Sequence, residues 1–122
     1  MAYLTNDNTT TTITTITSTT TTPPTTTTTK VDLLVVCGDF ECVRDIFDLE
    51  CLAVPLKYRH LNSFHRYVTG QQVAPVLTIF VGGNHEASNV LQSLYYGGYV
   101  APRIYFLGFG GVVNYKDIAI QI

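Results

Sequence analysis

Short apolar runs mark the strands that this chain is expected to form. Val31–Val36 and Val76–Val81 are predominantly apolar on successive positions and rich in β-branched side chains. That pattern is typical of strands covered on both faces of a sheet. Arg103–Leu107 is expected to be a third strand, and Val112–Tyr115 with Ile118–Ile122 a hairpin.

Helical periodicity separates these strands. Apolar residues recur at helical spacing in Glu41–Leu49, where Asp39 would cap the first turn. Tyr58–Val68 is expected to be a second helix that ends near Gly70, and Asn89–Tyr95 a short third one. Buried strands that alternate with helices indicate an α/β fold.

The first 29 residues differ from the rest in composition. Threonine fills 17 of these 29 positions. Such a segment has too little apolar surface to offset the entropy of ordering it, so we expect residues 1–29 to be a disordered, low-complexity, Thr-rich tail. A mucin-like stalk is the alternative for a Thr/Pro tract. The α/β domain would then occupy residues 30–122.

Charge and hydropathy limit the classes of protein to which this chain can belong. Residues 30–122 hold all seven Lys and Arg and eight of the nine Asp and Glu, whereas a protein that clamps RNA through many phosphates usually has a basic excess. Basic and aromatic residues alternate only in the strip 57–67, which is either a solvated helix face or a surface for a phosphate backbone. The sequence shows no signal peptide and no run of about 18 apolar residues, so we expect an intracellular protein without membrane association.

Three cysteines, Cys37, Cys42 and Cys51, lack the paired spacing of zinc sites. We expect reduced thiols, with Cys37 the most buried because it ends a strand. A catalytic thiol is disfavoured because the sequence places no histidine near any of the three.

Polar residues follow both buried strands. Gly38-Asp39 comes after the first strand and Gly83-Asn84-His85-Glu86 after the second. Open α/β sheets build their sites at this edge, and a pair of metal ions about 3.5–4 Å apart hydrolyses phosphodiesters. Asp39 would bridge the ions, and Asn84 would bind one of them. His85 would give a proton to the leaving oxygen or contact the phosphate, and Glu86 would orient His85 or fix the loop backbone.

Each of these residues also has a purely structural interpretation. Asp39 would be a helix cap, Asn84 a left-handed turn residue, and His85 an ordinary surface histidine. Finding both motifs after two buried strands of one chain favours the metal site. His60 and His65 lie five apart in the predicted second helix and are not expected to be ligands.

Four longer segments resemble one family. They are Gly38–Arg44, Ala53–His60, Ala74–Asn89 and Tyr96–Gly108, and they are similar to the RNA lariat debranching enzymes, which are calcineurin-like metallophosphoesterases. The similarity runs from about Val31 to the C-terminus. It includes segments with no general metallophosphoesterase role, which makes it specific.

The resemblance implies part of a calcineurin-like αββα sandwich and a divalent metal: Fe, Zn or Mn. It implies hydrolysis of the 2′–5′ phosphodiester branch of excised intron lariat RNA, in mRNA processing and RNA splicing in the nucleus. Carried over by motif, Asp39 and Asn84 would be metal ligands and His85 the proton donor.

The sequence departs from the family in its ligand set. The family opens with a Cys-Cys-His-Gly-type motif where this chain has the Thr tract, and the family's later histidines lie beyond Ile122. The chain also ends within an apolar alternation. We therefore expect a truncated or divergent member that binds metal weakly or not at all and is inactive alone.

The same departures suggest other roles. Incompletely covered sheet faces would invite self-association. A non-catalytic remnant that binds RNA or the intact enzyme is one alternative to the enzyme, and a truncated product without function is another.

Overall fold

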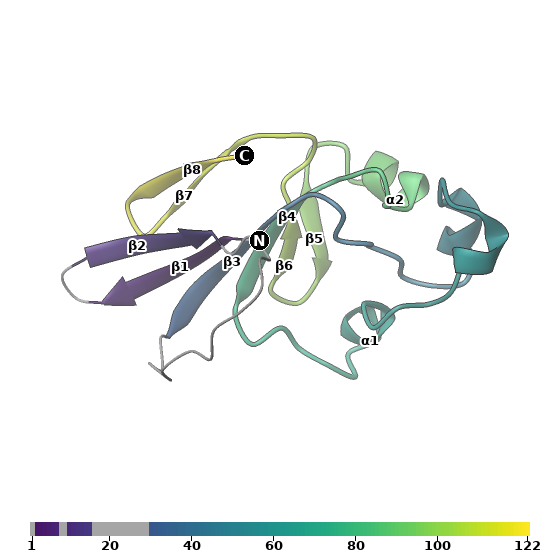
Figure 1. Cartoon of the computed structure of the whole chain (residues 1–122), viewed down its shortest axis with the longest axis horizontal. Helices are drawn as coiled ribbons and strands as arrows, with labels where there is room; N and C mark the ends of the chain where they lie inside the picture. The colour runs from purple at the N-terminus through teal and green to yellow at the C-terminus, as the bar shows by residue number, and fades with distance from the viewer. Residues whose placement is uncertain (1, 8–9, 16–29) are drawn as a thin grey trace, which may run out of the picture.

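Two β-sheets organise the computed structural model, which describes residues 2–7, 10–15 and 30–122 (Figure 1). Over these residues the larger sheet has six strands in the order β2-β1-β3-β4-β6-β5, and β7 and β8 pair as a hairpin. The larger sheet comprises β1 (Ala2–Asp7), β2 (Thr10–Thr15), β3 (Val31–Cys37), β4 (Leu77–Val81), β5 (Gly98–Ala101) and β6 (Ile104–Phe106). The other elements are β7 (Val112–Tyr115), β8 (Ile118–Gln121), the helices α1 (His65–Val68) and α2 (Ser88–Ser93), and the 3₁₀ turns η1 (Asp48–Cys51) and η2 (Leu56–Tyr58).

The middle of the larger sheet is parallel. Val35 of β3 pairs with Ile79 of β4, which pairs in turn with Tyr105 of β6. Because parallel strands point the same way, the chain leaves β3 and β4 at one edge of the sheet, where sites of open α/β folds are built. The α/β prediction and the strands expected at 31–36, 76–81 and 103–107 are confirmed to within about one residue at most ends.

The helix predicted over Glu41–Leu49 is wrong. Asp39 and Glu41 have φ of 48° and 57°, which breaks a right-handed helix at its start. The backbone N–H groups of residues 40–42 are bonded to the Glu86 carboxylate instead of to a helical ladder. Tertiary hydrogen bonds therefore override the helical periodicity, and only η1 forms at the end of this segment.

The second predicted helix, Tyr58–Val68, is also wrong over most of its length. Its first residue ends η2, and regular helix is confined to α1. Arg59 leaves η2 with an extended backbone and donates its side chain to carbonyls of residues 52 and 54. Strand β5 was not predicted, whereas α2 lies where a short helix was expected, one residue earlier.

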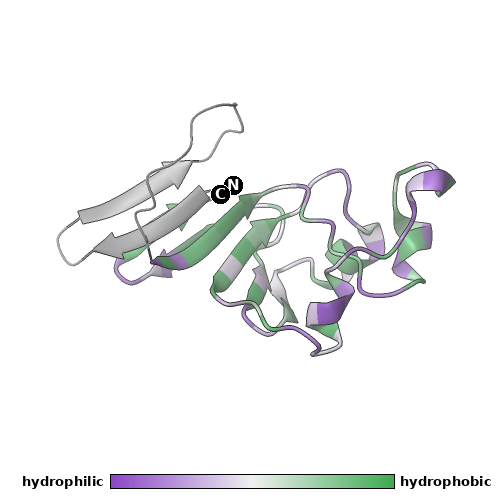
Figure 2. Cartoon of the chain, turned by 60° about the horizontal axis from the view of Figure 1, so that its bottom comes forward, coloured by the Kyte–Doolittle hydropathy of each residue, from purple (hydrophilic) through white to green (hydrophobic). Residues whose placement is uncertain are grey.

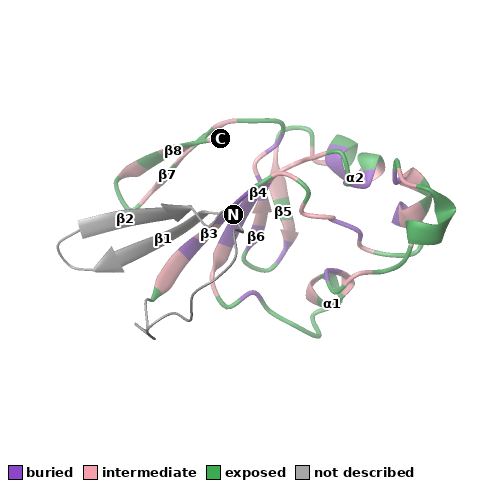
Figure 3. Ribbon diagram, viewed as in Figure 1, coloured by how far each residue is buried: buried purple, intermediate pink, exposed green. Residues whose placement is uncertain are grey.

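Hydrophobic clusters lie on both faces of the sheet at β3 and β4. Successive residues of β4 serve opposite faces: Phe80 packs in one hydrophobic cluster and Ile79 in the other. Phe80 is fully buried, with its ring centroid 4.3 Å from that of Phe40 and 5.2 Å from that of Phe106. Figure 3 shows the buried residues concentrated in β3, β4, β6 and α2.

The hairpin β7–β8 covers the second face. Its Val113, Tyr115 and Ile120 pack against Leu33 and Ile79, which are buried. The Tyr115 hydroxyl also donates a hydrogen bond of 3.3 Å to the carbonyl of Asp32. Figure 2 shows that apolar residues predominate along β3 and β4. The expectation of incompletely covered sheet faces is therefore corrected for β3 and β4, because the hairpin folds back over Leu33, Val35 and Ile79.

Two segments of the Thr-rich tail differ from the expected disorder. They form β1 and β2, and β1 pairs antiparallel with β3. β-branched threonine suits an extended backbone, and pairing occupies the backbone groups of β3 that would otherwise lie at a sheet edge. The rest of the 1–29 prediction lies outside the described residues. The division into 1–29 and 30–122 stays a prediction.

Candidate functional site

The loops that follow β3 and β4 touch at Asp39 and Gly83. The backbone N–H of His85 donates to Asp39 Oδ1 over 3.3 Å. A Cβ at Gly83 would overlap both Oδ1 and the backbone nitrogen of Asp39, so glycine alone permits this approach. No helix follows Asp39 in residues 40–47. The helix-cap interpretation is therefore wrong, and the carboxylate joins the two loops.

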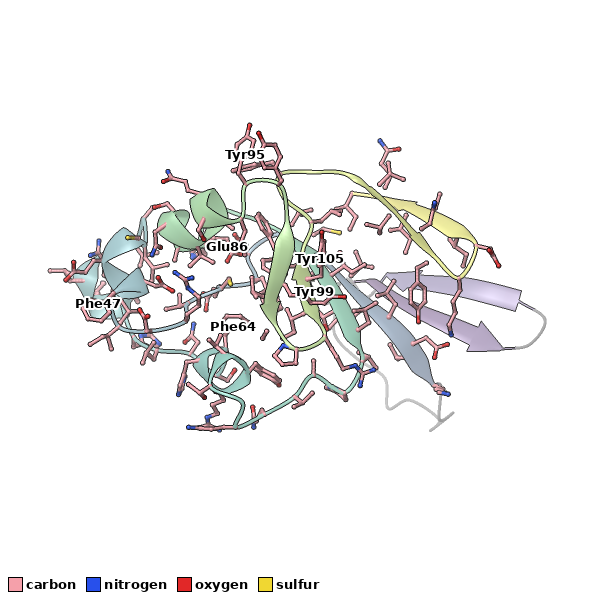
Figure 4. The ribbon with its side chains drawn as sticks, turned by 180° about the vertical axis from the view of Figure 1, so that it is seen from behind. Phe47, Phe64, Glu86, Tyr95, Tyr99 and Tyr105 are labelled. Atoms are coloured by element: carbon pink, nitrogen blue, oxygen red, sulfur yellow. The ribbon has the colours of Figure 1, made fainter. Side chains whose placement is uncertain are left out.

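Glu86 fixes the backbone beyond Asp39. Its Oε1 accepts hydrogen bonds from the N–H groups of Phe40 and Glu41 at 2.6 and 3.1 Å, and its Oε2 accepts one from Cys42 at 2.6 Å. Figure 4 shows Glu86 in the interior between α2 and the coil after β3. Within residues 30–122 no hydrogen bond joins Glu86 to His85. The second of the two roles predicted for Glu86, fixing the loop backbone, is thus the one observed.

Burial and hydrogen bonding act in opposite directions on the pKa of Glu86. Its side chain is only 4% exposed, and this desolvation raises the pKa of the carboxyl, with a smaller contribution from the charge of Asp39. The three backbone donors oppose the shift because they favour the charged form. The carboxyl therefore titrates above its ordinary range.

Asn84 and His85 lie at the surface, beside a cavity of about 500 Å³. The same cavity is lined by His60 and Asn62 from the coil before α1, and by Glu41 from the coil after β3. His60 was not expected to be a ligand, because a helix was predicted over this segment. The structure instead brings it to the cavity that His85 lines.

The donor set fits part of a metal centre. Asp39 and Asn84 offer oxygen atoms, which hard divalent ions prefer, and the loop contact holds them at one edge of the sheet. Across the described part of the chain, no three side chains of His, Cys, Asp or Glu are clustered so that they could hold an ion. Asp39 and Asn84 are therefore two oxygen donors of the kind predicted, fewer than a metal centre needs. Their roles as ligands, and that of His85 as proton donor, stay predictions.

The cysteines occupy three different environments. Cys42 is buried, Cys51 is half-buried, and Cys37 is exposed at the edge where β3 ends. The prediction that Cys37 is the most buried is wrong, because that end of the strand opens toward solvent. Burial, and then the charge of Glu86, raise the pKa of the Cys42 thiol to about 12, which makes it unreactive at neutral pH.

The basic strip does not form one helix face. Arg59 uses its guanidinium on the carbonyls of Val54 and Leu52, at 3.0 and 3.1 Å. Lys57 lies over the ring of Tyr58, with Nζ 4.7 Å from the ring centroid. The solvated-helix interpretation is wrong for residues 57–62, which belong to η2 and the coil after it, and Arg59 is structural. It holds for the last turn, where α1 exposes Arg66 and the preceding Phe64 is buried.

Comparisons place these observations among known proteins. A calcineurin-like phosphoesterase profile matches residues 12–122. The chain is 62% identical over 91 residues to the lariat debranching enzyme of Danio rerio, covering 75% of this chain and 16% of that protein. It is 62% identical over 90 residues to that of Homo sapiens, covering 74% and 16%. For Arabidopsis thaliana the identity is 60% over 91 residues, covering 75% and 22%.

These relatives are much longer than the matched region. The chain spans about a sixth of the length of the two animal proteins and about a fifth of the plant one. Among the helices of the described residues, none has the length and apolar character to cross a bilayer.

Proposed function

We propose a function from the premise that this chain belongs to the calcineurin-like phosphoesterase family. It carries part of the site of a metal-dependent phosphodiesterase that hydrolyses the 2′–5′ branch of lariat RNA. The observation that carries the proposal is the contact of Asp39 with the Gly83–His85 loop. It places two oxygen donors and a histidine together at the carboxyl edge of parallel strands.

Asp39 and Asn84 are the proposed metal ligands. Asp39 is held by its bond from the His85 backbone, and Asn84 follows the glycine that Asp39 packs against. A bound divalent ion, Fe, Zn or Mn by family resemblance, supplies neutralisation of phosphate charge and activation of water. Asp39 would hold the ion through its carboxylate, which has two oxygen acceptors.

His85 is the proposed proton donor to the leaving oxygen. Its side chain is exposed beside the cavity, where a phosphodiester can approach it. Imidazole changes charge near neutral pH, which suits it to this step. The hydrogen bond from its backbone to Asp39 ties its position to that of a proposed ligand.

We further propose that the chain is inactive by itself. A metal centre with two ligands binds weakly, because affinity follows ligand number and a preformed geometry. Self-association is one way to supply more ligands. By family resemblance we also propose a role in mRNA processing and RNA splicing, in the nucleus; the relatives are named lariat debranching enzymes.

The test is cleavage of a synthetic 2′–5′ branched RNA by the purified chain, with Mn²⁺, Fe²⁺ or Zn²⁺ added in turn. His85→Ala is assayed beside it, with His65→Gln as a control whose side chain does not line the cavity. We expect no cleavage by the isolated chain. Cleavage that His85→Ala abolishes and His65→Gln retains would support the site and overturn the claim of inactivity.

The site itself needs a second readout. We expect Mn²⁺ to broaden the NMR signals of residues 39 and 84 selectively, and Asp39→Asn with Asn84→Ala to remove this effect. Broadening spread evenly over the acidic residues would contradict the proposed ligands.

A further inference from the structure

The cavity beside His85, lined by residues of four separate segments, is larger than a proton donor and a metal ion require. We propose that it binds a nucleobase of the RNA, with Tyr58 stacking on the base and Glu41 and Asn62 bonding to its edge. This inference rests on the proposed function, because it takes RNA as the substrate. It adds a recognition site next to the bond that is cut.

The size and charge of the cavity suit a base. Its volume of about 500 Å³ lies within the usual range of small-ligand pockets, about 300–1,000 Å³. Among its lining residues Glu41 carries the one fixed charge, and this charge is negative. The negative charge of Glu41 disfavours a phosphate beside it but not a neutral heterocycle, so the base is assigned to the part of the cavity at Glu41 and the phosphodiester to the part at His85. Val43, Leu52, Val54 and Pro55 provide the apolar wall.

Tyr58 offers the stacking surface. It lines the cavity and is 56% exposed, so its ring is accessible to a ligand. Lys57 lies over one face of this ring, with Nζ 4.7 Å from its centroid, and we assign the other face to the base. Single-stranded RNA is recognised in this way, by unstacked bases placed on aromatic rings.

The polar edge is arranged before any ligand arrives. Asn62 donates its side-chain amide to Glu41 Oε2, and the backbone N–H of Glu41 is held in turn by Glu86. The pair keeps two acceptors, the second Glu41 oxygen and the Asn62 carbonyl oxygen. Adenine, cytosine and guanine offer such acceptors an exocyclic amino group with two N–H bonds, whereas uracil offers only its single ring N3–H. The cavity therefore favours an amino-bearing base.

The apolar wall of the cavity is also held in place before a ligand binds. Arg59 bonds the carbonyls of Leu52 and Val54, so the coil that carries the apolar wall is held by its backbone. A wall fixed in advance loses little freedom when a ligand binds.

The test is a binding cycle with a 2′–5′ branched RNA in EDTA, which prevents cleavage. Affinity for the full chain is measured by titration for wild type, Tyr58→Ala and Tyr58→Phe, with Tyr96→Ala as the control. Tyr96 is 93% exposed and lies outside the cavity. Matched RNAs lack the base at the branch nucleotide or at one of its neighbours.

We expect Tyr58→Ala to weaken binding about tenfold, and Tyr58→Phe and Tyr96→Ala to leave it unchanged. For one abasic RNA the Tyr58→Ala loss should disappear, since the stacking partner is already gone. Replacing the base at that position by uracil should weaken binding to wild type but not to a Glu41→Gln, Asn62→Leu double variant.

Two outcomes overturn the inference: no binding of the branched RNA, or a Tyr58→Ala loss of the same size for every abasic RNA. Neither measurement involves cleavage. A coupled loss without selective Mn²⁺ broadening at residues 39 and 84 would keep the base site and count against the proposed function, and selective broadening without coupling would do the reverse.

Discussion

At the scale of single residues, Glu86 links several observations that sequence alone kept apart. Its carboxylate takes three backbone N–H groups from residues 40–42. These bonds set the path of the coil after Asp39 and bring Glu41 to the cavity. Glu86, which the sequence motif places next to His85, therefore shapes both the coil after Asp39 and the cavity wall at Glu41.

Replacing Glu86 should lower the free energy of unfolding, and by more for alanine than for glutamine. Glu86→Gln keeps one acceptor oxygen and leaves one buried N–H facing an amide donor, which costs about 1–3 kcal/mol, and Glu86→Ala should cost more because all three donors lose their partner. Urea unfolding followed by circular dichroism measures both. Glu50→Ala, at an exposed position, is the control. Equal stability of Glu86→Ala and Glu50→Ala would contradict the role.

Asp48 should contribute a stability that depends on pH. Burial alone would raise the pKa of this carboxyl, but hydrogen bonds from Arg44 and Asn89 outweigh burial and hold the pKa below its ordinary 3.8. The shortest Arg44 side-chain contact is 2.9 Å. A depressed pKa in the folded state stabilises the fold above the unfolded pKa, and this contribution is lost as pH falls through the folded value.

The measurement is the free energy of unfolding of wild type and Asp48→Asn between pH 6 and pH 2. The advantage of wild type over Asp48→Asn should be constant above about pH 5 and shrink below about pH 4. Asp117→Asn, an exposed aspartate, should show no such change. A difference that does not depend on pH would refute the assignment.

Among the proposed site residues, the location of Asp39, Asn84 and His85 just beyond buried strands was predictable from the sequence, and their roles stay predictions. The location of Tyr58, Glu41 and Asn62 was not predictable. Their meeting depends on where the coil runs, which Glu86 and Arg59 determine through backbone groups. Side-chain patterns along the sequence carry no signal of such bonds.

At the scale of elements, most strands followed their sequence pattern, whereas only the last of the three predicted helices did. An apolar run such as 76–81 leaves a strand few alternatives, since both its faces must be buried. The segment 41–49 has apolar residues at helical spacing, but two positive φ values and the Glu86 bonds hold its start in another path. Local periodicity was a weaker constraint than tertiary hydrogen bonding.

Gly83→Ala should separate the β3 and β4 loops. The added Cβ would overlap the Asp39 carboxylate and its backbone nitrogen, and rigid backbone on both sides leaves it no room, so we expect a loss of about 1–3 kcal/mol in stability. Thermal unfolding measures this loss, and NMR shifts of Asp39 and His85 report the displaced loops.

Gly111→Ala is the matched control, because a Cβ there would meet only Leu107 at ordinary van der Waals distances of 3.4–3.8 Å. If the two variants are equally stable, the loop contact is not as close as described.

At the scale of the whole molecule, one sheet separates two hydrophobic clusters of unequal size. The larger contains α2 and the coil that bears the site, and the smaller lies under the hairpin β7–β8. The α/β class and most strands were predictable, but the covering of the second face was not. It depends on the hairpin turning back over β3, and the alternation within 112–122 does not indicate which sheet face it will meet.

The bonds of Arg59 to the carbonyls of Leu52 and Val54 have a consequence for protein engineering. Carbonyl oxygens belong to the backbone, so every amino acid at positions 52 and 54 presents them to the guanidinium. The exposed neighbours Ala53 and Pro55 line the cavity between and beside these anchored points. A combinatorial library at positions 53 and 55 would therefore vary the surface of the cavity while its scaffold stays in place.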